Sequence, residues 1–314
     1  MLVAAIQLIA GIALLYFGAD RLVKGSSSLA FRMGLSPLII GMTIVAFGTS
    51  APELVATIEA ALSGRSGIAV GNVVGSNICN IALVLGVAAL IHPVRTGVIL
   101  IQRDIPILIV ISIIAGVMLY DDRLYRTEGM VLIALLILHI FYSITVAKQG
   151  TTPFIETEFE DVIARKDAKP LVSALFVALG IGLLVPGASL FIDGASTLGR
   201  EFGLGEAVIG LSIVAFGTSL PELATTVLAA VRKESDIAIG NVVGSSIFNI
   251  LGILGITTLI SPIEGSGVAI YDVGLMIVLS VLLIPLARTG FKIDRFEGGI
   301  LVIVYVVYMT QLVW

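Results

Sequence analysis

The stretch Ala46-Phe47-Gly48-Thr49-Ser50-Ala51-Pro52-Glu53 decides the fold, because it returns as Ala215-Phe216-Gly217-Thr218-Ser219-Leu220-Pro221-Glu222. The surrounding segments 41–80 and 210–249 align without a gap, at an offset of 169 residues, and are identical at about 25 of the 40 positions. A carboxylate, a proline and small hydroxyls thus lie twice inside otherwise apolar runs. This combination is what a cation site within a membrane needs.

The composition indicates a protein embedded in a lipid bilayer. The chain has 314 residues, of which 58% are hydrophobic and 13% charged, and its mean hydropathy is +1.11. Continuously apolar runs of about 17–25 residues are typical of membrane-spanning helices, whereas a barrel strand alternates. We therefore predict an all-α membrane protein with ten transmembrane helices, at roughly 2–20, 36–62, 68–91, 105–120, 129–147, 171–192, 204–231, 237–260, 269–287 and 297–314.

The basic residues predict the orientation of these helices. Of the 18 Lys and Arg residues, 14 fall in loops on one side and four (Arg65, Arg123, Arg126 and Arg200) on the other. Because cytoplasmic loops carry the excess of basic residues, we expect both termini outside the cytoplasmic membrane. Five helices per half is an odd number, so the halves 1–147 and 171–314 should be inverted repeats.

The segment 148–170 joins the two halves and is the longest polar stretch of the chain. We expect a solvated cytoplasmic linker. A regulatory calcium sensor is the alternative, although the segment lacks a glycine-turned loop with ligands at alternating positions.

Glu53 and Glu222 fall near the middle of predicted helices two and seven. An ionised side chain at that depth costs at least about 2.5–3.5 kcal/mol, and the predicted helices place no Lys or Arg at comparable depth. Either both carboxylates are protonated, or a mobile cation supplies the missing charge. Pro52 and Pro221 should break their helices and free backbone carbonyls. Carboxylates and carbonyls are ligands for calcium, and sodium accepts the same kinds of oxygen.

The glycine-asparagine stretch 71–80 and its repeat 240–249 should form a second wall of the site. Ser76 and Asn80 share one helix face, as do Ser245 and Asn249, and buried amides need polar partners. We expect the motif glycines to allow close helix packing. Glu59 is expected to lie outside the site, because its repeat counterpart is Leu228.

With these motifs the chain resembles the cation/calcium antiporter superfamily, most closely the prokaryotic sodium/calcium exchangers. The resemblance implies two inverted halves of five helices, in which helices one and six slide over the rest. It also implies that Asn249, which is aspartate in many relatives, argues against potassium co-transport. The implied calcium ligands are Glu53, Glu222, Thr49 and Thr218. The implied sodium and central-site residues are Ala46, Ala215, Ser50, Ser219, Ser76, Ser245, Asn80 and Asn249.

The sequence therefore predicts an antiporter that exchanges sodium for calcium by alternating access at a mid-membrane glutamate pair. A proton/calcium exchanger on the same fold is the first alternative, and a passive cation channel is the second. We expect no enzyme activity, because His92 and His139 are the only histidines and no catalytic set is available. Ca²⁺, Na⁺ and the lipid bilayer are the expected partners, without a cofactor, nucleic acid or obligate protein partner.

Overall fold

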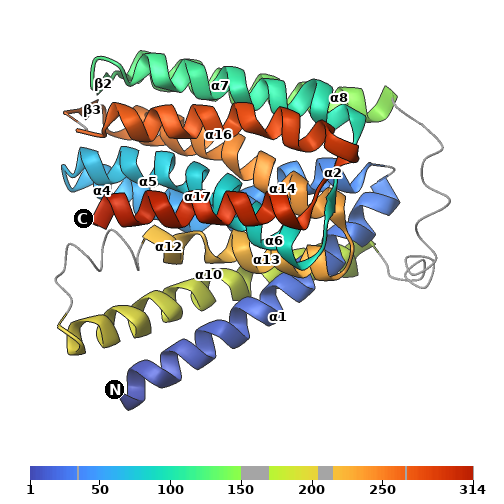
Figure 1. Ribbon diagram of the computed structural model, residues 1–314, viewed down its shortest axis with the longest axis horizontal. Helices are drawn as coiled ribbons and strands as arrows, with labels where there is room; N and C mark the ends of the chain where they lie inside the picture. Colours follow the sequence, from blue (N-terminus) through green and yellow to red (C-terminus); the bar gives the residue numbers. More distant parts are fainter. Residues whose placement is uncertain (34, 150–169, 204–214, 266, 314) are drawn as a thin grey trace.

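The structure, a computed structural model, describes residues 1–33, 35–149, 170–203, 215–265 and 267–313. Nearly all of the regular structure in these ranges is helical (Figure 1). Within them, seven helices are long and apolar enough to cross a membrane, and an eighth is counted if one bent pair forms a single span. The chain is therefore an all-α membrane protein. The count of ten spans stays a prediction, and predicted helix seven lies partly outside the described residues.

The first half begins with a helix much longer than predicted. Helix α1 continues through Arg21 and Lys24 to its end at Met33. The next span is broken, as the prolines predict: the helices on either side of Ser50 are bent by 46°. The helical elements of this half are α1 (Leu2–Met33), α2 (Pro37–Ile40), η1 (Gly41–Val45), α3 (Ala46–Thr49), α4 (Ala51–Leu62), α5 (Ser66–Ile78), η2 (Cys79–Val84), α6 (Leu85–Ile91), η3 (Leu100–Asp104), α7 (Ile105–Met118) and α8 (Arg126–Gln149).

The second half repeats this order of elements. Its helical elements are α10 (Pro170–Glu201), α12 (Ala215–Thr218), α13 (Leu220–Val231), α14 (Ser235–Phe248), η5 (Asn249–Leu254), α15 (Gly255–Ile260), α16 (Ile270–Arg288), η6 (Thr289–Phe291) and α17 (Arg295–Val313). In Figure 1, α1 begins and α17 ends at the same end of the molecule. The predicted linker 148–170 lies almost entirely outside the described residues, so its role stays untested.

Two short antiparallel ladders join the halves. Strand β1 (Val94–Arg95) pairs with β4 (Lys292–Ile293), and β2 (Arg123–Leu124) pairs with β3 (Ile263–Glu264). The offset of 169 residues relates β1 to β3 and β2 to β4. Because η3 and α7 separate β1 from β2 along the chain, the two ladders lie at opposite ends of these helices.

The interior carries polar groups, and much of the surface is apolar. Large side chains such as Val117, Tyr271 and Ile303 are exposed, whereas Glu53, Glu222 and most of the repeated Ser, Thr and Asn residues are buried. This distribution suits a protein whose surroundings are lipid and whose function lies inside.

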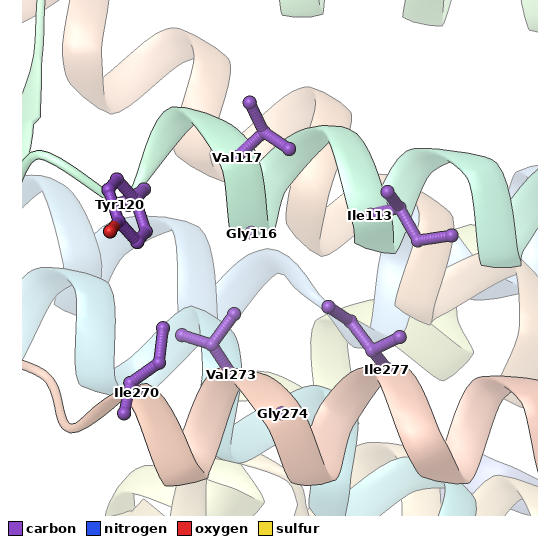
Figure 2. Close-up of a pocket in the computed structure, with 8 residues that line it drawn as sticks. All are labelled: Ile113, Gly116, Val117, Tyr120, Ile270, Val273, Gly274 and Ile277. Atoms are coloured by element: carbon purple, nitrogen blue, oxygen red, sulfur yellow. The ribbon is translucent and has the colours of Figure 1, made fainter.

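An apolar groove of about 300 Å³ lies between α7 and α16 (Figure 2). Ile113 and Ile277 lie toward one end of the labelled set, and Tyr120 and Ile270 toward the other. Its lining offers almost no oxygen ligands for an ion, so the polar site must be sought among the buried residues instead.

Candidate ion-binding site

Each glutamate lies in the first turn of a helix that follows a break. Ser50 (φ −82°, ψ 8°) separates α3 from α4, and Ser219 (φ −88°, ψ 5°) precedes α13. Proline is tolerated in a first turn because its missing N–H would have no helical partner there. The start of a helix carries partial positive charge from its free N–H groups. The breaks therefore stabilise two carboxylates that hydrocarbon alone would destabilise.

The two halves complete each other's carboxylates. Ser50 Oγ, beside Glu53 in sequence, donates to Glu222 Oε1 at 2.8 Å. Ser219 Oγ, beside Glu222, donates to Glu53 Oε1 at 3.2 Å. The sequence-predicted pair thus converges, and the serines join the halves crosswise.

Both glutamates retain capacity for another partner. Their side chains are 1% and 0% exposed, yet Glu53 Oε2 and Glu222 Oε2 have no hydrogen-bond partner among the described residues. None of the salt bridges among the described residues involves Glu53 or Glu222. Two buried carboxylates that lack a salt-bridge partner among the described residues form a centre that a cation or a proton would stabilise.

Two asparagines support the glutamate backbones, a role the sequence did not predict. Asn72 Nδ2 donates to Thr57 Oγ1 at 2.8 Å and to the Glu53 carbonyl at 3.3 Å. Asn241 Nδ2 does the same with Thr226 Oγ1 at 2.9 Å and the Glu222 carbonyl at 3.5 Å. The pairs are related by the repeat offset, and that signal in the sequence could have revealed them.

Thr49 links the first helix break to the opposite half. Its hydroxyl oxygen lies 3.2 Å from both the Ala46 carbonyl and Asn241 Oδ1, either of which can accept its one hydrogen, and 3.4 Å from Ser245 Oγ. Ser245 Oγ also lies 3.5 Å from the Ala46 carbonyl. Three predicted residues, Ala46, Thr49 and Ser245, therefore gather in one polar cluster against Asn241.

The remaining predicted residues are less fully placed. Ser76, Asn80, Thr218 and Asn249 are buried. The side-chain polar atoms of Ser76, Asn80 and Asn249 have no partner in the described ranges. Ala215 begins α12. Glu59, expected outside the site, is exposed.

The helices change hydrogen-bonding pattern beside the asparagines. The π-helix η2 begins at Cys79 and contains Asn80, and η5 begins at Asn249. Single π-turns are rare and frequently occur at functional sites. Sequence periodicity did not predict them.

The motif glycines are not equivalent in the two halves. A Cβ on Gly240 would lie 2.7 Å from the Leu38 carbonyl oxygen, and one on Gly244 would lie 2.5 Å from Met42 backbone atoms, which confirms close packing there. For Gly71 and Gly75, the described residues provide no neighbour within 4 Å.

The donor set suits hard cations. Carboxylates, hydroxyls, amides and carbonyls favour calcium, sodium and related ions, whereas softer ligands favour transition metals. No cluster of three or more His, Cys, Asp or Glu side chains occurs in the residues that the structure describes. An ion at this position would be met by oxygen atoms.

Comparison with known proteins identifies the class. The family model described as sodium/calcium exchanger protein matches residues 3–145 and 172–314, so the chain belongs to this family of membrane transporters.

Several relatives align over nearly the whole chain. The chain is 36% identical over 318 residues to the inner membrane protein YrbG of Escherichia coli, covering 100% of this chain and 98% of the relative. It is 32% identical over 342 residues to the sodium/calcium exchanger MaX1 of Methanosarcina acetivorans, covering 97% of each. The solved structure of the sodium-calcium exchanger NCX_Mj matches with a TM-score of 0.86 at 31% identity, over 98% of both chains.

Proposed function

We propose that this protein exchanges sodium for calcium across the cytoplasmic membrane, with Glu53 and Glu222 as the shared ion site. The observation that carries the proposal is the crosswise pair of buried carboxylates, each with one oxygen bonded to a serine of the other half and one oxygen unpartnered. Membership of the sodium/calcium exchanger family and the likeness to MaX1 and NCX_Mj support the same choice of ions.

Charge balance gives the proposed coupling. When both carboxylates are ionised, one Ca²⁺ balances their combined negative charge, and sodium ions would neutralise the same pair. Since both ions need the same oxygens, their occupancy is mutually exclusive. Calcium therefore leaves on one side before sodium binds, and a site that stays empty retains the cost of two uncompensated buried charges.

The surrounding oxygens would complete the coordination. Calcium takes about 6–8 oxygen ligands, more than two carboxylates supply. We propose Thr49 and Thr218 as further calcium ligands. For sodium and the central site we propose Ala46, Ala215, Ser50, Ser219, Ser76, Ser245, Asn80 and Asn249.

The proposal includes two inverted halves that alternate access to the site. The two ladders support this relation, because the repeat offset relates β1–β4 to the β2–β3 ladder at the opposite end of α7. With an even number of spans, both termini would lie on the same side of the membrane. The excess of basic residues in the loops of the other side would place the termini outside. Exchange of equivalent roles between the halves would then open the site first to one side and then to the other.

Proton/calcium exchange is the second candidate, and one observation favours it. Glu53 Oε2 and Glu222 Oε2 are buried without a partner among the described residues, and a proton on each carboxyl would remove the buried charge as sodium would. The geometry of the glutamate pair suits both couplings, so the driving ion must be measured.

Transport in liposomes tests the proposal. Purified protein is reconstituted into liposomes, and calcium uptake is followed under an outward sodium gradient, under a proton gradient with equal sodium on both sides, and under neither gradient. We expect uptake with the sodium gradient. Uptake with only the proton gradient would establish the second candidate, and rapid non-saturating uptake with no gradient would indicate a channel.

A matched pair of variants tests the residues. Glu53→Gln keeps the shape of the side chain and removes its charge, so calcium uptake should be abolished. Glu59→Gln is the control, because Glu59 lies on the same helix but is exposed. Uptake by Glu53→Gln at the rate of the control would refute the assignment of the site.

A further inference from the structure

The two long inclined helices contact the rest of the protein unequally. Helix α1 packs along α13, whereas α10 touches α4, the counterpart of α13 in the repeat, at few positions. Identical halves in identical states would make these contacts equal. Helix α1 therefore packs more extensively against α13 than α10 packs against α4.

A cluster of charged side chains joins α1 to the end of α13. Asp20 of α1 binds Arg21 at 3.0 Å and Lys24 at 2.9 Å on its own helix, and it also binds Arg232, the residue after α13. About two turns further along α1, Ser27 Oγ donates to Glu234 in the same α13–α14 connection. Two polar contacts thus hold α1 to one short segment.

The Asp20–Arg232 pair is sheltered from solvent. The two side chains are 10% and 20% exposed, so this is not the freely hydrated kind of ion pair that contributes little. When Arg232 is removed, Asp20 still has Arg21 and Lys24 on its own helix, so its charge stays paired. What is lost is the ion pair that joins α1 to the end of α13, and this loss should weaken the contact between the two helices.

The repeat has no charged counterpart of this pair. At the offset of 169 residues, Asp20 corresponds to Ser189 and Arg232 to Ser63. Ser27 corresponds to Ser196, and Glu234 to the oppositely charged Arg65. The chain therefore encodes the Asp20–Arg232 ion pair at one end of the molecule and two serines at the equivalent positions of the other.

Helices α1 and α10 pack too closely to move independently. A Cβ on Gly18 would lie 2.9 Å from Leu184 N, one on Gly25 would lie 2.8 Å from Ser173 O, and one on Gly180 would lie 2.6 Å from Leu22 N. With backbones in direct contact along their length, a shift of α1 away from α13 carries α10 with it toward α4.

We propose that Asp20 and Arg232, assisted by Ser27 and Glu234, form an ionic gate that holds one end of the transport path closed. The gate biases the protein toward this state, and its absence from the opposite end makes the two states unequal in energy. The inference rests on the proposed alternating-access function, but it concerns the populations of the two states and not the identity of the ions.

Distances between paired spin labels test the gate. In a cysteine-free background (Cys79→Ala), one pair is placed at positions 33 and 231, which report on the gated end. The second pair is placed at positions 62 and 202, their counterparts at the offset of 169. All four native residues, Met33, Leu62, Phe202 and Val231, are exposed, so labels should be tolerated.

Removing the gate should change the two spin-label distances in opposite directions. In Arg232→Gln we expect the 33–231 distance to lengthen and the 62–202 distance to shorten, with the ratio of the two states changing about tenfold or more. Arg21→Gln is the control, because Arg21 binds Asp20 from the same helix and leaves the link between helices intact. Arg232→Lys should restore the original distances.

A second construction tests the asymmetry by adding a gate. Ser63→Arg with Ser189→Asp places the same two charges at the opposite end, and should enlarge the population with a short 62–202 distance. Unchanged distances in Arg232→Gln, or changes equal to those of Arg21→Gln, would overturn the gate. These distances are measured without an ion gradient. If they refuted the gate, sodium-driven calcium uptake in the liposome assay could still be observed. Conversely, proton-driven uptake would refute sodium coupling without refuting the gate.

Discussion

Replacement of Gly244 by alanine should separate α14 from η1, the π-helix that contains Met42. An alanine Cβ would lie 2.5 Å from the Cα and carbonyl oxygen of Met42, whereas ordinary contact begins near 3.4 Å. Backbone atoms cannot rotate away as a side chain can, so the two segments must move apart by about 0.9 Å. Overpacking of this kind costs typically about 1–3 kcal/mol.

The same displacement should disturb the ion site. Ser245 follows the substituted residue, and its hydroxyl lies 3.4 Å from Thr49 Oγ1 and 3.5 Å from the Ala46 carbonyl. Both distances are already at the limit of a hydrogen bond, so a displacement of this size would break them. We expect transport by Gly244→Ala to respond less to the concentrations of calcium and sodium. We also expect the variant to have lower thermal stability.

Gly182→Ala is the matched control. Gly182 lies inside α10 with no neighbour within 4 Å of its Cβ position in the described part of the chain. Alanine there should be neutral or stabilising by up to about 1 kcal/mol, because it favours the helix. Thermal unfolding in detergent and calcium uptake in liposomes are measured for both variants. Equal stability and equal ion dependence of Gly244→Ala and Gly182→Ala would refute the packing argument.

Three further predictions follow from the contacts of the site. Ser50→Ala and Ser219→Ala each remove a hydrogen bond to a carboxylate. Such a bond is worth about 1.5–3 kcal/mol, so calcium affinity measured by calorimetry should fall at least about tenfold. Ser246→Ala is the control, because it removes a buried hydroxyl with no partner in the described ranges and should leave the affinity unchanged. Asn241→Ala removes the support of Thr226 and the Glu222 carbonyl, and should destabilise the fold by about 1–3 kcal/mol in thermal or denaturant unfolding, unlike Gln311→Ala on the exposed end of α17. Calcium at 100 times its dissociation constant should stabilise the protein by about 2.7 kcal/mol, seen as a higher melting temperature, and that increase should be absent in Glu222→Gln.

The repeat in the sequence was sufficient to predict the convergence of the two glutamates. A charged residue at equal positions in two apolar segments, each beside proline, leaves few arrangements other than a shared interior site. The helix breaks at Ser50 and Ser219 were likewise predictable, because proline removes a backbone donor wherever it stands.

Other features depend on contacts between segments far apart in the chain. Nothing local indicates that Ser50 bonds to Glu222 and not to its neighbour Glu53, because that choice is set by how the halves dock. The π-helices at Cys79 and Asn249 also escape periodicity, since one inserted residue per turn leaves composition unchanged. Helix α1 continued to Met33 because Asp20 binds Arg21, Lys24 and Arg232, which lets charged residues remain in a helix that hydropathy alone would end early.

The crossed serines have a consequence for the origin of the molecule. A single ancestral half would carry a carboxylate but could not supply the hydroxyl donor that this carboxylate uses, because the donor comes from the other copy. Such an ancestor could build the site only as a pair of subunits, which the inverted arrangement proposed above would insert in opposite directions. Fusion of duplicated genes would then have fixed both orientations in one polypeptide, after which each copy was free to diverge at residues that serve one side of the membrane alone.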